Sequence, residues 1–154
     1  MMLDDIVEDL IKEHDGGENF FEALDDSIRD KEYIDQLYDM FLKDCEEENA
    51  DPSYYAIVVS GKFGIYFQKE YPGLNAILVN GGLRHDDIMD LTPFADDING
   101  RVFVFLDDSF YNGRTAKKIG LGLIDHGGRL ERVYVVYNGS KNRNIRSLYS
   151  YYGV

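Results

Sequence analysis

The sequence is poor in cysteine, in long hydrophobic runs and in positive charge, and each shortage excludes a class of protein. Its one cysteine, Cys45, excludes a disulfide framework and zinc or redox sites of the Cys-x-x-Cys type. No segment approaches the roughly 18 consecutive apolar residues that a transmembrane helix needs. The first ten residues are acidic where a secretory signal would be basic, so we expect a cytoplasmic protein that does not contact a membrane.

Positive charge is scarce and unevenly placed. The chain has 16 Lys and Arg against 29 Asp and Glu, a formal net charge of −13. Binding of a nucleic-acid backbone or an anionic membrane requires net positive surface, so neither is an expected partner. The first 50 residues hold 18 of the acids and only 4 of the bases. The remaining 104 residues are therefore almost neutral, which suits an anionic small molecule.

The 154 residues, 44% of them hydrophobic, suffice for one folded domain with a core of its own. Apolar residues recur at helical spacing over 6–11, 20–28 and 33–42. The acidic run 44–51, followed by Pro52, is typical of a solvated exit loop. We therefore expect an N-terminal helical segment over 1–50 and an α/β core over 51–154. The acidic helix faces are either plain solvated surface or a surface that binds a basic partner.

The core reads as strands that alternate with helices. Short, non-alternating apolar runs over 54–60, 76–80, 102–106 and 133–137 predict strands buried on both faces of a parallel sheet. Helix-compatible stretches lie between them over 65–71 and 115–126, and residues 148–152 could add an edge strand. The predicted fold class is α/β, a mostly parallel open sheet of about five strands with flanking helices, plus the acidic N-terminal helices.

The most informative segment follows the run 102–106. Two carboxylates, Asp107 and Asp108, end that predicted strand, and a loop with Ser109 and Gly113 leads to a helix beginning near Thr115. Ligands of open α/β sheets bind at the carboxyl ends of the strands. A helix N-terminus binds phosphate through its backbone N–H groups, and glycine lets the backbone approach closely. Carboxylates suit sugar hydroxyls or hydrated Mg²⁺ instead, so the pattern indicates a ribose 5-phosphate site.

The stretch VFVFLDDSFYNGRTA resembles the phosphoribosyl pyrophosphate (PRPP) signature of the type I phosphoribosyltransferases. The resemblance covers residues 54–138 and implies that family's fold, a Mg²⁺-dependent reaction and a possible homodimer. It also implies a base-contacting hood, here built from the N-terminal helices or residues 138–154. Receiver domains and haloacid dehalogenases also carry acid pairs at a strand end, but after the first strand, whereas two predicted strands precede this pair.

The resemblance assigns roles residue by residue. It implies that Asp107 and Asp108 are catalytic, holding the ribose hydroxyls and a magnesium ion through water or those hydroxyls. The implied 5′-phosphate site comprises Ser109, Tyr111, Asn112, Gly113, Arg114 and Thr115. The implied pyrophosphate site comprises Ser60, Gly61, Lys62, Phe63 and Gly64. Arg84 and His85, in the stretch 81–100, are the candidates for stabilising the leaving group.

Two positions depart from the family pattern. Asn112 stands where threonine or serine is usual, so an amide replaces a hydroxyl donor. Tyr111 stands where hypoxanthine-guanine enzymes have an aspartate that takes a proton from the purine, and a phenol is a poor base at neutral pH. This argues against that purine-salvage class.

Three functions follow from these patterns. The first is a phosphoribosyltransferase that moves ribose 5-phosphate from PRPP to a nitrogenous base and releases pyrophosphate. The second is a non-catalytic protein of the same fold that binds PRPP or a nucleotide and has a regulatory role. The third is an acidic protein-interaction module in which the α/β part is only a scaffold.

Overall fold

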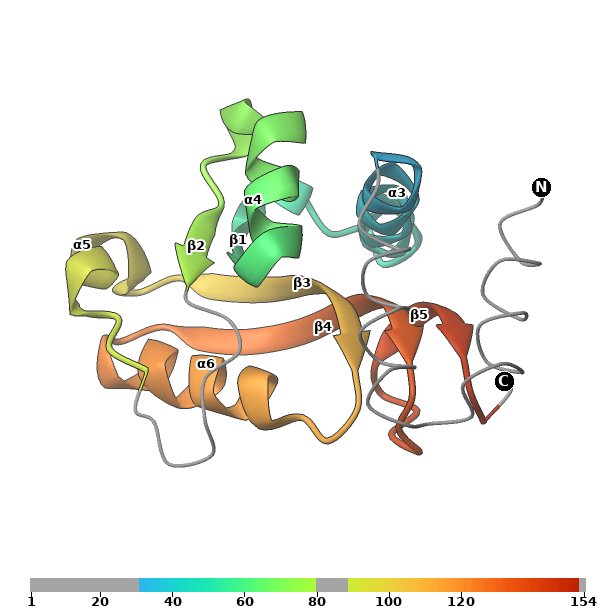
Figure 1. Cartoon of the computed structure of the whole chain (residues 1–154). Coiled ribbons are helices and arrows are strands. Elements are labelled where there is room, and N and C mark those ends of the chain that lie inside the picture. The colour runs from blue at the N-terminus through green and yellow to red at the C-terminus, as the bar shows by residue number, and fades with distance from the viewer. Residues whose placement is uncertain (1–30, 80–88, 153–154) are drawn as a thin grey trace.

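The computed structural model describes residues 31–79 and 89–152. The helices predicted over 6–11 and 20–28 lie outside the described residues, as do Arg84 and His85. Figure 1 shows a single sheet with helices on both of its faces.

The sheet has five parallel strands in the order β2-β1-β3-β4-β5. They are β1 (Tyr55–Ser60), β2 (Ile77–Val79), β3 (Val102–Phe110), β4 (Arg129–Asn138) and β5 (Arg146–Ser150). The predicted parallel α/β sheet is therefore confirmed. β3 and β4 are longer than their apolar runs, because the polar residues at their ends still pair with neighbouring strands, as Asp107 does with Val135.

Both faces of the sheet are covered, which explains why the strands do not alternate between apolar and polar residues. Val104 and Leu106 of β3 pack into a core with α3 (Lys31–Glu47) and α4 (Gly61–Glu70). Phe103 and Phe105 point to the other face, where α6 (Arg114–Asp125) and the short α5 (Ala95–Ile98) pack. Successive side chains of a strand point to opposite faces, so a strand buried on both sides is apolar throughout.

Helix α4 starts at Gly61, four residues before the predicted start of that helix. Its first turn contains two glycines, which are poor helix formers. Phe63 of that turn is nevertheless only 1% exposed and packs into the core with Phe67 one turn later. Tertiary packing therefore extends the helix to the end of β1, a contribution that local propensity does not show.

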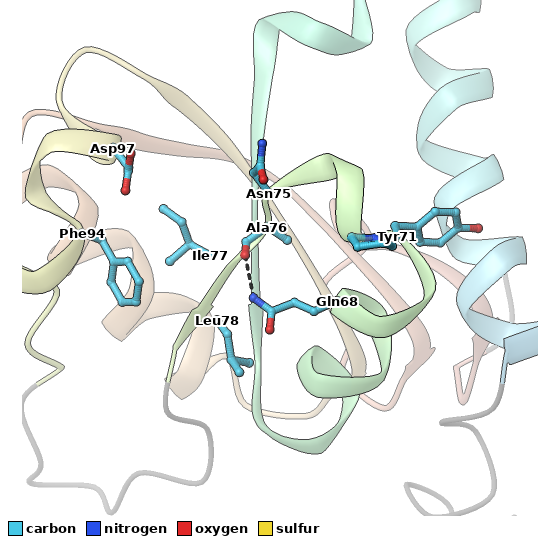
Figure 2. Close-up of a pocket in the computed structure, with 9 residues that line it drawn as sticks. Gln68, Tyr71, Asn75, Ala76, Ile77, Leu78, Phe94 and Asp97 are labelled. Carbon is cyan, nitrogen blue, oxygen red and sulfur yellow. Dashed lines mark hydrogen bonds between the residues drawn. The ribbon is translucent and has the colours of Figure 1, made fainter.

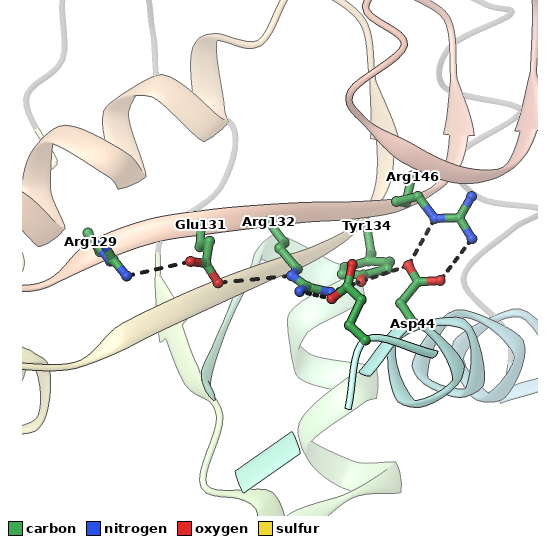
Figure 3. Close-up of polar contacts among 7 residues, drawn as sticks. Asp44, Arg129, Glu131, Arg132, Tyr134 and Arg146 are labelled. Atoms are coloured by element: carbon green, nitrogen blue, oxygen red, sulfur yellow. Dashed lines mark hydrogen bonds and ion pairs between the residues drawn. The ribbon is translucent and has the colours of Figure 1, made fainter. Parts of the chain in front are cut away.

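The acidic run 44–51 is only partly an exit loop, which corrects the prediction. Helix α3 continues to Glu47, and Asp44 is tied to the sheet (Figure 3). Its carboxylate accepts hydrogen bonds from Arg146 Nε and Nη2, at 2.9 and 3.0 Å, and from the Tyr134 hydroxyl at 2.9 Å. Arg132 pairs with Glu48 beside them. These partners come from β4 and β5, more than 80 residues later, so the composition of the run could not reveal them.

We expect Asp44→Asn to lower the free energy of unfolding by about 1 kcal/mol at pH 7. Burial raises the pKa of Asp44, but hydrogen bonds from Arg146 and Tyr134 outweigh it and hold that pKa below its usual value. The stabilisation is therefore present above the unfolded pKa and is lost as pH falls through the lower folded pKa. Urea unfolding at pH 7 and near pH 3 measures it, with Glu46→Gln, an exposed acid on the same helix, as control. Equal stability of Asp44→Asn and wild type at pH 7 would contradict the assignment.

Strand β5 pairs only with the second half of β4, from Tyr134↔Arg146 to Asn138↔Ser150. Parallel neighbours usually need a crossover of a dozen or more residues. Residues 139–145 suffice here because the chain returns by only about half the length of β4. As a result β4 and β5 end at the same level, and the Tyr151 N–H donates to the Asn138 carbonyl at 3.0 Å.

Candidate functional site

The candidate site lies between β1 and β3, where the strand order reverses. In open α/β sheets this switch point, at the carboxyl ends of the strands, is where ligands bind. A cavity of about 430 Å³ lies there. It is lined by Ser60, Gly61, Lys62, Phe105, Asp107, Asp108, Ser109, Phe110, Tyr111, Asn112, Gly113, Thr115 and Ala116. The structure thus brings together the two segments that the sequence placed around one ligand.

The N-terminus of α6 opens on this cavity, and its cap residue, Gly113, has no side chain that could bind the first turn. Gly113 precedes the helix with φ of +76°, a left-handed conformation that favours glycine. The Asn112 Oδ1 accepts the Arg114 N–H at 3.0 Å. Among the residues that the structure describes, the N–H groups of Thr115 and Ala116 have no acceptor. The first turn carries no acid, and Arg114 and Lys117 oppose the helix dipole, an arrangement that an anion would stabilise.

The N-terminus of α4 opens on the same cavity from β1. Ser60 precedes this helix without a side-chain hydrogen bond to it, and no acid lies in its first turn. Gly61 has φ of +59°, and the exposed Lys62 supplies a cation at the cavity. Two helix N-termini therefore converge on one cavity, and each is suited to bind an anion.

Asp107 and Asp108 line the cavity between these two helix ends. Asp108 is only 7% exposed, Asp107 is half-buried, and the Ser109 hydroxyl lies 3.3 Å from Asp108 Oδ1. No group of three or more His, Cys, Asp or Glu side chains in residues 31–79 and 89–152 could hold a metal ion. Two carboxylates fit Mg²⁺ that takes its other ligands from water and substrate phosphates, which is how this ion usually binds.

The predicted pyrophosphate segment divides into two parts. Ser60, Gly61 and Lys62 line the cavity, whereas Phe63 lies in the core. A Cβ on Gly64 would lie 2.5 Å from a Leu78 methyl, so this glycine permits close packing of α4 on the sheet. Binding of pyrophosphate by the backbone of Phe63 and Gly64 stays a prediction. Arg114, predicted to bind the 5′-phosphate, is exposed beside the cavity and does not line it.

Sequence reasoning missed two aromatic wall residues of the cavity. Phe105 and Phe110 line it, and the Phe110 ring lies under Gly113, 2.9 Å from where a Cβ would be. Phe105 belongs to the apolar run of β3 and gives no separate signal in the sequence. Phe110 lies in the motif, but nothing in its spacing distinguishes a wall residue from a loop residue.

A row of tyrosines continues from the cavity along the carboxyl ends of β4 and β5. The sequence analysis named Tyr111 and the segment 138–154 separately and did not predict that they lie together. The centres of the Tyr111 and Tyr137 rings lie 6.1 Å apart. The Tyr111 ring also packs on Gly139, where an added Cβ would lie 2.7 Å from the Tyr111 Cδ1 atom. The Gly139 N–H donates to the Phe110 carbonyl at 2.8 Å, which joins the end of β4 to the end of β3. Burial, with Tyr151 and Tyr152 nearby, raises the pKa of Tyr137 to about 12. We call Tyr111, Gly139, Tyr151 and Tyr152 the tyrosine edge.

Two further cavities contain none of the predicted site residues. One of about 480 Å³ lies along β2, where the Gln68 side-chain amide donates to the Ala76 carbonyl at 2.8 Å (Figure 2). The other, of about 770 Å³, is lined by residues on α3, at the start of β1 and in the turn before β2, and by Asp97 and Arg101 ahead of β3. That end of a parallel sheet is opposite the one where ligands of α/β folds bind.

No family model matches the sequence, and no curated protein is similar to it in sequence. Within residues 31–79 and 89–152, every helix is too short or too polar to span a membrane. Solved structures do resemble the chain. Adenine phosphoribosyltransferase from Giardia lamblia, complexed with 9-deazaadenine, superposes with a TM-score of 0.54 at 14% identity, over 81% of this chain and 83% of that one.

Two further solved structures have the same fold. Purine phosphoribosyltransferase from Pyrococcus horikoshii has a TM-score of 0.52 at 8% identity, over 76% of this chain and 82% of that one. Orotate phosphoribosyltransferase from Mycobacterium tuberculosis has a TM-score of 0.50 at 13% identity, over 78% and 74%. The resemblance carried by residues 54–138 is thereby confirmed at the level of the fold, and the subgroup stays open. This chain has the α/β fold of the type I phosphoribosyltransferases.

Proposed function

We propose that the protein is a Mg²⁺-dependent phosphoribosyltransferase that transfers ribose 5-phosphate from PRPP to a nitrogenous base and releases pyrophosphate. One observation carries the proposal: the N-termini of α4 and α6 open on the same cavity, with Asp107 and Asp108 between them. PRPP has the matching order of groups, because its ribose hydroxyls lie between a phosphate and a pyrophosphate.

Each end of the cavity suits one part of this substrate. The Thr115 and Ala116 N–H groups and the α6 dipole bind the 5′-phosphate. The N-terminus of α4 and the Lys62 ammonium bind the pyrophosphate. Asp107 and Asp108 accept hydrogen bonds from the ribose 2′- and 3′-hydroxyls. Carboxylates suit this role, because they accept hydrogen bonds from hydroxyl groups but repel a phosphate.

The reaction is a displacement at the anomeric carbon. A ring nitrogen of the base forms the new bond to carbon as the carbon–oxygen bond to pyrophosphate breaks, with inversion, and the nitrogen loses its proton to solvent. Lys62 and the α4 amides stabilise the charge that develops on the departing pyrophosphate. Bound Mg²⁺, held by Asp107 and Asp108 through water, would neutralise part of that charge. Arg84 and His85, predicted to stabilise the leaving group, lie outside the described residues, so their roles stay predictions.

Thermal unfolding with pyrophosphate, ribose 5-phosphate or PRPP, each with and without Mg²⁺, tests the site. We expect each of the two smaller ligands to stabilise the protein and PRPP to stabilise it more. Gly113→Ala should weaken ribose 5-phosphate binding about tenfold, because a Cβ strains the left-handed turn that aims the α6 amides, and should spare pyrophosphate. Gly100→Ala is the matched control, since φ there is +75° with open space around it. Absence of stabilisation by all three ligands would overturn the proposal.

The second candidate, a regulatory protein that binds PRPP or a nucleotide without turnover, is favoured by Asn112. Its side chain accepts the Arg114 N–H and so removes one amide donor from the phosphate site. Release of pyrophosphate from PRPP in the presence of a panel of bases distinguishes the two functions. PRPP binding without release of pyrophosphate under any base would favour the second.

A further inference from the structure

A cavity of about 770 Å³ lies at the amino ends of β1, β2 and β3, away from the site of the proposed reaction. Small-molecule sites have volumes of about 300–1,000 Å³, so this cavity is large enough for a ligand. It shares no lining residue with the cavity of the acid pair, so what it binds is independent of the proposed function. It combines an aromatic wall with charges of both signs, which limits the kind of ligand that fits.

The aromatic wall is built by α3 and the start of β1. Tyr38, Phe41 and Tyr55 line the cavity there. The ring centres of Tyr38 and Phe41 lie 6.1 Å apart, and those of Phe41 and Tyr55 lie 5.8 Å apart in an edge-to-face pair. The Arg132 guanidinium lies 5.0 Å from the centre of the Tyr55 ring and helps to hold that ring in place. Rings fixed in contact in this way form an apolar surface on which the aromatic ring of a ligand packs.

Two opposite charges reach the cavity from a tight turn between α5 and β3. Residues Ile98 to Arg101 form a type II β-turn, in which the Arg101 N–H donates to the Ile98 carbonyl at 3.0 Å. Asn99 has φ of −55° and ψ of 124°, and Gly100 has φ of +75°, as this turn type requires. The ends of such a turn lie within about 7 Å, so the Cα atoms of Asp97 and Arg101 are at most about 11 Å apart. Both side chains line the cavity.

Of the charged side chains that line the cavity, Asp51 is already used. Its carboxylate accepts the Ser53 N–H at 2.9 Å and caps the 3₁₀ turn before β1. Asp97 and Arg101 are exposed, and neither side chain has a hydrogen bond or an ion pair elsewhere in the described part of the chain. One carboxylate is therefore available for an ammonium group, and one guanidinium for a carboxylate, which arginine binds through two parallel hydrogen bonds.

We propose that this cavity binds an aromatic α-amino acid. The carboxylate of the ligand pairs with Arg101, its ammonium group pairs with Asp97, and its ring packs on Tyr38 and Tyr55. An α-amino acid carries its two charged groups on one carbon, which suits two side chains held by one turn. A ligand with only one of these charges leaves the other side chain without a partner, and a ligand without a ring leaves the aromatic wall uncovered.

The absence of tryptophan from the chain provides a direct test, because the fluorescence of an added indole can be excited separately from that of the protein's 12 tyrosines. The probes are L-tryptophan, tryptamine, which lacks the carboxylate, and indolepropionate, which lacks the ammonium group. Fluorescence anisotropy of each probe at increasing concentrations of the full chain measures binding. We expect L-tryptophan to bind at least about tenfold more tightly than either analogue, since each analogue loses one charge-assisted contact.

Two variants assign the charges. Arg101→Gln should weaken binding of L-tryptophan about tenfold and leave binding of tryptamine unchanged. Asp97→Asn should also weaken binding of L-tryptophan but leave binding of indolepropionate unchanged. Asp96→Asn and Arg129→Gln are the matched controls, because both residues are exposed and neither lines the cavity. They should bind all three probes as the wild type does, and thermal unfolding shows that all four variants fold.

Several results would overturn this assignment. Equal affinities for the three probes would mean that only the ring is recognised. A preference for L-tryptophan that survives in both Arg101→Gln and Asp97→Asn would remove these side chains from the site. L-Phenylalanine, followed by calorimetry, covers a cavity too narrow for indole, and the proposal is wrong if neither amino acid binds. L-Tryptophan should bind Asp108→Asn as it binds the wild type, and weaker binding to that variant would place the ligand in the other cavity instead.

Discussion

Asp108→Asn is expected to lower the rate of pyrophosphate release from PRPP at least about 100-fold. Asp108 is only 7% exposed and lies in the cavity between the two helix N-termini. Under the proposed function, asparagine preserves the shape of this side chain but loses the charge that would stabilise an electron-poor anomeric carbon and accept strongly from a ribose hydroxyl. Steady-state rates with saturating PRPP measure the loss, and calorimetry shows how much of it is weaker substrate binding.

The control for this prediction is Asp125→Asn, which removes the same charge from the exposed end of α6. Its rate should match that of the wild type, and both variants should unfold at similar temperatures. An Asp108→Asn protein that is folded and keeps more than about a tenth of the wild-type rate would remove the acid pair from the mechanism.

A second large effect is expected in stability. Gly64→Val should lower the free energy of unfolding by about 2 kcal/mol, since overpacking a close contact costs 1–3 kcal/mol. A Cβ at Gly64 would lie 2.5 Å from a Leu78 methyl, 3.1 Å from a Val59 methyl and 3.2 Å from the Val59 main-chain carbon. The methyl of Leu78 can rotate away, but the backbone of β1 cannot, so α4 must move off the sheet.

Urea unfolding followed by circular dichroism measures this change, and Gly73→Val is the matched control. Gly73 lies in the short 3₁₀ turn before β2, and a Cβ there would meet nothing within 4 Å. Its substitution should change stability by less than about 0.5 kcal/mol, as surface changes usually do. Equal stability of the two variants would show that α4 does not need its close contact with β1.

The sequence predicted the sheet well because its strands are buried on both faces, which leaves uninterrupted apolar runs. It predicted the ends of elements less well. The strand predicted over 102–106 continues to Phe110, since Asp107 and Ser109 pair with β4 even though they read as loop residues. Helix α4 begins four residues before its predicted start because Phe63 packs into the core. In both cases the deciding contacts are with distant parts of the chain.

The same distinction applies to the site. The acid pair and the turn to α6 are contiguous, so their chemistry could be recognised from the sequence. The tyrosine edge could not, because Tyr111, Gly139 and Tyr151 come from three segments that only the register of β3, β4 and β5 brings together. Nor could Gly64 be distinguished from Gly61 by sequence alone. Gly64 lies on the face of α4 that packs against β1 and β2, and Gly61 faces the cavity.

The edge of the sheet at β2 has a consequence for the behaviour of the protein at high concentration. An exposed edge strand offers unpaired backbone groups to other molecules and is a site of aggregation. β2 has only three residues, Pro72 and a 3₁₀ turn precede it, and the Gln68 side chain occupies the carbonyl of Ala76 (Figure 2). A neighbouring molecule therefore meets too short a ladder to extend the sheet, which protects this edge from pairing with another molecule.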